Sequence, residues 1–157
     1  MDVAELERET REAEAEMTRG RARFVAAVRR AYASGMSQRQ IAAHCKRSQP
    51  EIGRLLKFHG TSPHGRALRA RREALLAALA SHGISNVRVF GSTARGTDRA
   101  DSDIDLLVTA AEPLGLLVQS RIENEISDLL GVPADLVFDD AIRPDLAARI
   151  LTEAVPL

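Results

Sequence analysis

The chain of 157 residues lacks the features that mark several classes of protein. Aromatic residues make up 3% of it and Trp is absent, so a core has to be built mainly from Leu, Ile, Val and Ala, which suits helices. Its single cysteine, Cys45, excludes an internal disulfide and a cysteine-rich zinc site. No apolar run approaches the roughly 20 residues of a membrane span, and the acidic start is unlike a signal peptide. We therefore expect a cytoplasmic protein with no membrane contact.

The formal net charge of zero is the sum of three segments of opposite sign. Residues 1–16 hold seven acids and two arginines, a net charge of −5. Residues 17–72 hold fourteen Lys and Arg against Glu51 alone, a net charge of +13, and residues 73–157 carry −8. A basic block followed by an acidic one indicates two domains with different partners.

Helix caps and turn formers divide the chain at similar places. Residues 2–33 are rich in Ala, Glu and Arg and predict one long helix or two abutting helices. Ser37 and Ser48 each begin a capping-box pattern, so two short helices should follow. Turn formers in residues 59–65 indicate a linker. We expect an acidic helical extension at residues 1–19, a basic helical domain at 20–59, a linker at 60–65 and a second domain at 66–157.

The second domain has a mixed pattern. Short β-branched runs predict strands at residues 87–90, 104–109 and 136–138. Helical periodicity predicts helices at residues 66–81, 114–130 and 144–153. The four histidines share no metal-ligand spacing, so we expect them at surface or cap positions.

Residues 36–56 have the helix-turn-helix pattern, in which apolar positions such as Ile41, Ile52 and Leu55 pack two helices together. The stretch resembles bacterial DNA-binding regulators of the phage-repressor-like class. It departs from their pattern in the turn, where Lys46 and Arg47 replace the usual Gly and aliphatic residue. The other interpretation of the basic block is a helical cap or dimerisation domain with a solvated basic face.

The resemblance implies that the second short helix enters the major groove of operator DNA. There Gln can pair with adenine and Arg with guanine, while Lys and Arg around the turn hold phosphates. The residues expected to bind DNA are Arg39, Lys46, Arg47, Ser48, Gln49, Arg54 and Lys57. Helix-turn-helix proteins usually bind palindromes as dimers, so a homodimer is one alternative.

Asp103 and Asp105 open one of the expected strands. Residues two apart on a strand point to the same face, so both carboxylates face one site while Ile104 turns into the core. Two like charges at such a short distance repel each other unless a cation lies between them, and oxygen ligands suit Mg²⁺. Asp135 opens the last expected strand and is a third acid for this site.

A Gly-Ser turn precedes these acids. Gly91 lets the backbone approach a phosphate, and the Ser92 hydroxyl and the amides of a short helix can donate to it. Gly91-Ser92, ten intervening residues, Asp103-x-Asp105 and the later strand acid Asp135 together resemble the minimal nucleotidyltransferases of the DNA polymerase beta superfamily.

The resemblance implies an α+β fold class, with a small mixed or antiparallel sheet flanked by helices after the helical N-terminal domain. It also implies nucleotide transfer from a triphosphate with two Mg²⁺ ions. Asp103 and Asp105 would bind both metals, and Asp135 would bind one and activate the attacking hydroxyl. The triphosphate would be held by Gly91 and Ser92, together with Arg95 or Arg99.

Small bacterial nucleotidyltransferases of this kind are often antitoxins that attach AMP to a tyrosine of a toxin of the higher-eukaryote-and-prokaryote nucleotide-binding (HEPN) class. The resemblance thus implies an adenylyltransferase that uses ATP, neutralises a HEPN-like toxin and represses its own operon. Two alternatives stay open. One is a DNA-binding regulator whose inactive transferase domain senses nucleotide; the other is a transferase that acts on tRNA or a small molecule.

Overall fold

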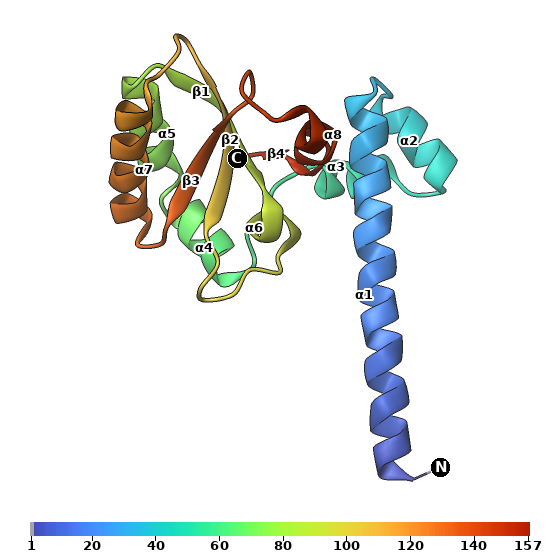
Figure 1. Ribbon diagram of the computed structural model, residues 1–157. Coiled ribbons are helices and arrows are strands. Elements are labelled where there is room, and N and C mark those ends of the chain that lie inside the picture. Colours follow the sequence, from blue (N-terminus) through green and yellow to red (C-terminus); the bar gives the residue numbers. More distant parts are fainter. Residues whose placement is uncertain (1) are drawn as a thin grey trace. The chain divides into compact units, whose positions relative to one another are not determined.

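The computed structural model describes residues 2–157, and the chain divides into two compact units, Met1–Leu55 and Leu56–Leu157 (Figure 1). The division lies a few residues before the boundary expected between residues 59 and 60. In this described part of the chain, no helix combines the length and the apolar character that crossing a bilayer needs.

The first unit is helical throughout. A long helix, α1 (Val3–Ala33), is followed by two short ones, α2 (Gln38–Cys45) and α3 (Gln49–Leu55). α1 is one uninterrupted helix of 31 residues, and its N-cap side chain, Asp2, accepts a hydrogen bond from the N–H of Glu5 at 2.7 Å. α2 and α3 pack against each other and against α1, and the buried side chains there are Val28, Ile41, Ala42 and Ile52.

Both predicted capping boxes are confirmed. The Ser37 hydroxyl accepts a hydrogen bond from the N–H of Gln40 at 3.3 Å, and the N–H of Ser37 donates to Gln40 Oε1 at 2.9 Å. Ser48 and Glu51 repeat the arrangement at the start of α3, with distances of 3.4 and 2.8 Å. Each short helix therefore begins with its first amides satisfied.

The turn between α2 and α3 bends at Lys46, which caps α2 with φ 52° and ψ 45°. This is the left-handed region, which glycine adopts freely and which a residue with a Cβ disfavours by about 1 kcal/mol. Helix-turn-helix patterns usually have glycine at this place. The tight turn thus forms with lysine in the strained position.

The strain at Lys46 predicts that Lys46→Gly stabilises the first unit. We expect a gain of about 0.5–1 kcal/mol in its free energy of unfolding, because glycine has no Cβ to clash in the left-handed region. Urea denaturation followed by far-ultraviolet circular dichroism measures it. Arg39→Gly, inside α2, is the control and should lose about 1 kcal/mol. A Lys46→Gly protein that unfolds at lower urea than wild type would contradict the prediction.

The second unit is a four-stranded sheet with helices, as the predicted fold class requires. In chain order its elements are α4 (Pro63–Ala70), α5 (Arg72–Ser81), β1 (Ile84–Phe90), α6 (Gly91–Arg95), β2 (Ile104–Ala110), α7 (Leu116–Leu130), β3 (Ala134–Phe138), α8 (Pro144–Glu153) and β4 (Val155–Pro156). The sheet order is β3-β2-β1-β4; β2 runs parallel to β3, and the other pairs are antiparallel.

Two parts of this unit differ from the expectation. The single helix predicted over residues 66–81 is two helices, because Arg71 leaves the helical conformation with φ −107° and ψ 9° and becomes the cap between α4 and α5. β4 was not predicted, since two residues at the end of the chain carry no alternation that could mark a strand. The three predicted strands and the helices α7 and α8 are confirmed within a few residues.

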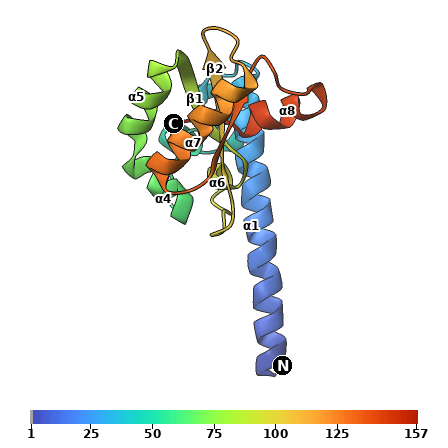
Figure 2. The same ribbon diagram turned by 60° about the vertical axis from the view of Figure 1, so that its left-hand side comes forward.

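The two faces of the sheet carry different cores. One face carries the larger core, which includes Val87, Val89 and Leu106 and to which buried residues of α5 and α7 belong. Figures 1 and 2 show the two helices α5 and α7 against the sheet. On the opposite face Phe90 and Leu107 pack with Ile150 of α8. Because side chains alternate along a strand, Asp105 shares this second face with Leu107.

The edge strand β3 is closed by polar side chains of α7. Gln119 Nε2 donates to the carbonyl of Leu136 at 3.0 Å, and Glu123 Oε1 accepts from its N–H at 3.1 Å. One helical turn further on, Ser127 Oγ accepts from the N–H of Ala134 at 3.0 Å. Side chains four residues apart on α7 thus replace a neighbouring strand.

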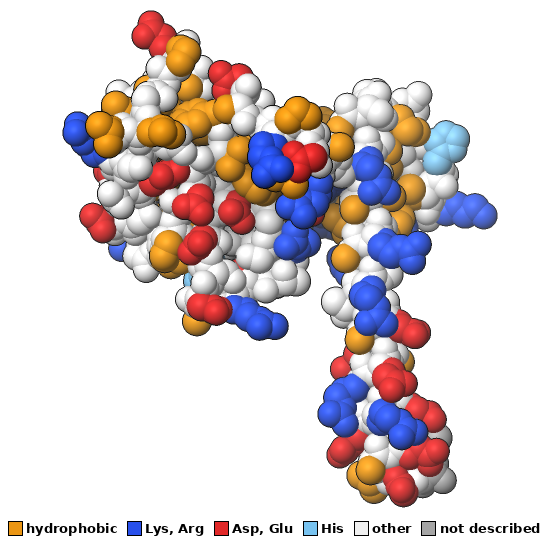
Figure 3. Space-filling model, viewed as in Figure 1, with side chains coloured by type: hydrophobic (Ala, Val, Ile, Leu, Met, Phe, Trp, Pro, Cys, Tyr) orange, Lys and Arg blue, Asp and Glu red, His pale blue; other side chains and the backbone are white. Residues whose placement is uncertain are grey.

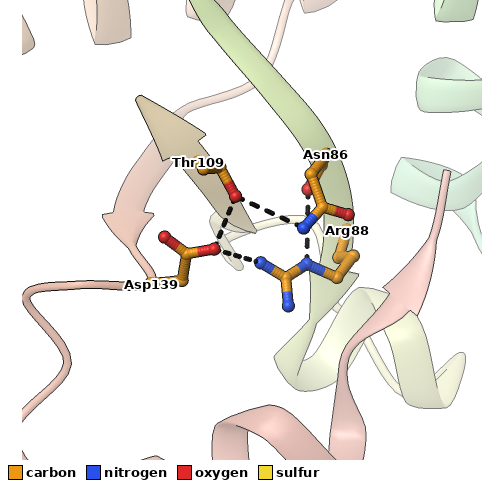
Figure 4. A network of polar contacts seen from close by, with 4 residues as sticks. All are labelled: Asn86, Arg88, Thr109 and Asp139. Carbon is orange, nitrogen blue, oxygen red and sulfur yellow. Dashed lines mark hydrogen bonds and ion pairs between the residues drawn. The ribbon is translucent and has the colours of Figure 1, made fainter. Parts of the chain in front are cut away.

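A polar network links β1, β2 and the segment after β3 (Figure 4). Arg88 Nη2 forms an ion pair with Asp139 Oδ2 at 2.9 Å, and the Thr109 hydroxyl donates to the same oxygen. Asn86 Nδ2 donates to Thr109 Oγ1 at 3.3 Å. Asp139 is therefore an acid with a structural role.

The expected linker is packed into the second unit. Gly60, Ser62, His64 and Gly65 are buried, and a Cβ built on Gly65 would lie 2.6 Å from the Cα of Gly60. His64 lies at the start of α4, but it is 6% exposed, so the expected surface position is wrong for this histidine.

Candidate active site

The pairing of β2 with its two neighbours brings the predicted acids together. Asp105 lies opposite Phe90 of the antiparallel strand β1 and opposite Asp135 of the parallel strand β3. Asp103 comes directly before β2, two residues from Asp105 and hence on the same side of the strand. The three carboxylates proposed from the sequence therefore gather at one end of the sheet.

The proximity of these acids changes their ionisation. Burial raises the pKa of Asp105 to about 6, with further contributions from the charges of Asp135 and Asp103. The Arg95 guanidinium acts in the opposite direction, and Glu153 adds to the rise. The pKa of Asp135 is also raised, by burial first and then by Asp103 and Glu123. The site is an acidic cluster that a cation would stabilise.

The donor set of this cluster fits a divalent metal ion such as Mg²⁺, because it consists of carboxylate oxygens on adjacent strands. Within residues 2–157, no three His, Cys, Asp or Glu side chains are already arranged around a point that could hold a metal ion. The carboxylates of Asp103, Asp105 and Asp135 would thus have to draw together around a bound ion.

Gly91 is fitted closely to Asp105. It has φ +69°, and a Cβ built on it would collide with the Asp105 carboxylate. Glycine is therefore required twice, for the backbone conformation and for the close approach. Ser92, partly exposed, follows at the start of α6, so the Gly-Ser turn lies directly beside the acids.

The two predicted phosphate-binding arginines are placed differently. Arg95, at the end of α6, forms an ion pair with Glu153 of α8 at 2.8 Å and is close enough to Asp105 to lower its pKa. Arg99 is exposed in the loop before β2, and its N–H donates to Ser102 Oγ at 2.9 Å. Both arginines are exposed, and Arg95 is the one that lies close to the acidic cluster.

Two residues near the site were missed by the sequence reasoning. Glu153 contributes charge to the cluster, but it lies in a helix nearly fifty residues from Asp105 and no motif marks it. Asp98 has a fully buried side chain, whose Oδ2 accepts from the N–H of His64 at 2.9 Å. Its pKa is lowered, against the effect of burial, by hydrogen bonds from Ser62 and His64. Asp98 thereby ties the loop that leads to Asp103 to the start of α4.

The predicted DNA-binding residues are all exposed. Six of the seven lie in α2, the turn and α3, while Lys57 follows the division between the units. Ser48 uses its hydroxyl in the capping box of α3, and the Arg47 guanidinium lies 5.9 Å from the centroid of the Phe24 ring. Arg39, Lys46, Gln49 and Lys57 are the members whose side chains have no such local role among the contacts of residues 2–157.

The Asp-x-Asp at the start of β2 lies beside a carboxylate of the parallel neighbouring strand, and the Gly-Ser turn lies against it. Carboxylates suit a divalent cation, and a Gly-Ser turn suits a phosphate group. The comparisons with known proteins identify the family. The chain belongs to the nucleotidyltransferase domain family, whose pattern matches residues 72–157.

The relatives extend over about half of the chain. A Methanocaldococcus jannaschii protein, MJ0435, named provisionally as a protein adenylyltransferase, is 40% identical over 77 residues, which are 49% of this chain and 83% of the relative. Protein adenylyltransferase MntA of Thermococcus cleftensis is 37% identical over 73 residues, which are 46% of this chain and 74% of the relative.

Solved structures show the same fold. One described provisionally as a minimal nucleotidyltransferase is 49% identical, with a TM-score of 0.53, and the match covers 59% of this chain and 94% of that one. A second, described as a toxin-antitoxin with AMP-PNP, is 23% identical with a TM-score of 0.50, covers 54% of this chain and 69% of that one, and bears on the fold alone.

The raised pKa of Asp105 predicts a pH-dependent gain of stability in Asp105→Asn. The folded chain binds the Asp105 proton more tightly than the unfolded chain, whose pKa is 3.8, so the stabilising contribution of the protonated carboxyl is lost as the pH rises through about 6. The neutral amide avoids this loss. After allowance for screening by solvent, we expect Asp105→Asn to raise the free energy of unfolding by about 1 kcal/mol above pH 6. Near pH 3.8 the substitution should have little effect.

Urea unfolding at about pH 7.5 and about pH 4, with a chelator present, measures this difference. Asp101→Asn is the matched control, because Asp101 is an exposed acid of the same loop and its substitution makes the same change of charge. Equal or lower stability of Asp105→Asn at the higher pH would contradict the electrostatic interpretation.

Proposed function

We propose that the chain transfers AMP from ATP to a hydroxyl of a partner protein, a HEPN-like toxin, and that its first unit binds operator DNA. The chain would then be the antitoxin and the autorepressor of a toxin-antitoxin operon. The observation that carries the proposal is the position of Asp105, which lies between Asp135 on one side and the Gly91 turn on the other.

The chemistry follows from where these groups lie. The acceptor hydroxyl attacks the α-phosphorus; its O–P bond forms while the bond to the β-phosphate oxygen breaks, and pyrophosphate leaves. A carboxylate oxygen of Asp135 takes the proton of the attacking hydroxyl, while Gly91 and Ser92 hold the triphosphate. Two Mg²⁺ ions held by Asp103, Asp105 and Asp135 would supply neutralisation of the charge that builds on the attacking and leaving oxygens.

A protein acceptor is supported by the relatives, which carry the name protein adenylyltransferase. DNA binding is supported by different observations. The first unit has two capped short helices joined by a tight turn, and exposed basic and amide side chains line the turn and the start of α3. Residues 17–55 of this unit hold nine Lys and Arg against Glu51 alone, a net charge of +8, which favours a polyanion as their partner.

The transfer activity predicts a specific pattern of losses. Labelled ATP, Mg²⁺ and the product of the adjacent reading frame should yield a labelled partner with the wild-type chain. Asp103→Asn and Asp105→Asn should each reduce the label at least about a thousandfold, because the carboxylates that hold the ions are lost. Asp101→Asn is the control: it makes the same change of charge near the same site and should retain activity.

The outcomes of this assay separate the alternatives. Label on the partner that is equal for wild type and Asp103→Asn contradicts the proposed catalytic acids. ATP binding with no turnover by the wild-type chain would indicate the nucleotide-sensing regulator. Label on tRNA or on a small molecule, with none on protein, would identify a different acceptor class.

DNA binding predicts two distinguishable effects in fluorescence anisotropy. Gln49→Ala, at the start of α3, should weaken binding to DNA from upstream of the chain's own gene about tenfold or more, since a base contact is lost. Binding to a duplex of scrambled sequence should be unaffected. Arg39→Ala should weaken binding to both duplexes and make the affinity depend less steeply on salt concentration, since a phosphate contact is lost.

Arg11→Ala removes an exposed arginine from the acidic half of α1 and is the control for net charge. No preference of the wild-type chain for its upstream sequence over the scrambled duplex would remove the operator-binding part of the proposal. The transferase part would be unaffected, because it is tested by a different assay.

A further inference from the structure

The first twenty residues of α1 have no packing partner within their own unit. Every residue from 6 to 23 is exposed, while α2 and α3 cover only the later turns around Val28. Three large apolar side chains stand on this stretch, namely Val3 at 73% exposure, Leu6 at 50% and Met17 at 73%. A helix without tertiary contacts is marginal in water, so an apolar stripe on it indicates a surface that is normally covered.

The apolar positions follow a heptad seam. Spacings of three and four residues, alternating, place one row of side chains along α1, the pattern of a coiled-coil interface. The row consists of Val3, Leu6, Thr10, Ala13, Met17, Gly20, Phe24 and Ala27. Its first half carries the larger exposed side chains, and its second half has small residues around Phe24.

The surface of α1 is hollowed where the small residues lie. The shallow hollow is lined by Gly20, Arg23, Phe24, Ala26, Ala27 and Arg30. In an antiparallel pair of α1 helices, Leu6 of one copy faces Phe24 of the other, and Val3 faces Ala27. The larger side chains of each N-terminal half would then enter the hollow of the other copy, as knobs enter holes.

Charge selects the antiparallel orientation. Residues 1–16 carry a net charge of −5, and residues 17–33 hold five arginines and no acid, a net charge of +5 (Figure 3). Beside the seam, Glu7 would face Arg21 of the other copy, and Glu9 would face Arg23. At the centre of this register Glu14 and Glu16 each face their own copy, which makes two like-charge contacts. A parallel pair would make four, because Asp2 would lie beside Glu7 and Glu9 beside Glu14 on both sides, and it is therefore the less favourable orientation.

We propose that α1 is an antiparallel dimerisation arm whose occupant is α1 of a second copy of this chain. The interface consists of the heptad seam, and the opposite charges of its two halves set the register. Association weakens as salt is added, because the flanking charges are exposed and screened. The arm would be independent of the transfer chemistry, since it lies wholly in the first unit.

Two charge-reversal variants of the full-length chain test the arm. E7R/E9R places arginines opposite Arg21 and Arg23 of the other copy, and R21E/R23E places glutamates opposite Glu7 and Glu9. Sedimentation equilibrium of wild type over a range of concentrations should show a monomer–dimer equilibrium. Each variant alone should have a dimer dissociation constant raised about tenfold or more, because attractive contacts become repulsive.

Mixing the two variants should restore the wild-type affinity as a heterodimer, since the arginines of one variant at positions 7, 9, 21 and 23 then face the glutamates of the other. The quadruple variant E7R/E9R/R21E/R23E should restore it as a homodimer. Wild type that stays monomeric at all concentrations overturns the proposal. Dimerisation that is unchanged in both charge variants also overturns it, because the interface would then lie elsewhere.

The orientation is tested by cysteine cross-linking in a Cys45→Ala background, which removes the native thiol. Val3→Cys mixed with Ala27→Cys should form an intermolecular disulfide under mild oxidation, and Thr10→Cys alone should not. A cross-link in Thr10→Cys with none in the mixture would show a parallel pair and overturn the antiparallel arm.

Discussion

The candidate active site depends on one backbone pairing, the parallel register that sets Asp105 of β2 beside Asp135 of β3. On its other side β2 pairs with β1, which ends at the turn that holds Gly91 against the Asp105 carboxylate. A shift of either pairing by one residue would turn the acids to the opposite face, where α5 and α7 contribute to the larger core. The register therefore keeps charged groups out of the core and brings them together in the same step.

The closeness of these acids lowers the free energy of unfolding of the second unit, and other interactions must offset this loss. Burial and mutual repulsion raise the pKa of Asp105 to about 6, so at neutral pH the folded chain holds a carboxylate that would be more stable in water. The cores on both faces of the sheet supply the opposing free energy. Functional sites are commonly assembled in this way, with local strain accepted where the chemistry requires it.

Much of this arrangement follows from patterns that are short in sequence. The capping residues Ser37 and Ser48, the strand alternation around Asp105 and the glycine at position 91 each encode local geometry, and the structure agrees with all three. What the sequence could not predict depends on long-range packing. The buried pairing of Asp98 with His64 joins segments 34 residues apart, and Glu153 reaches the site from the end of the chain. An isolated Asp in a polar loop and a Glu in an amphipathic helix look like solvated residues until the fold places them.

The polar side chains of α7 that cover β3 also determine how this protein can meet others. The N–H groups of Ala134 and Leu136 and the carbonyl of Leu136 already have partners in Ser127, Glu123 and Gln119. An incoming extended peptide would have to displace these side chains before it could hydrogen-bond to that edge. Recognition of another protein by strand addition is thereby disfavoured on this side of the sheet, and so is the edge-to-edge stacking through which newly made sheet proteins aggregate.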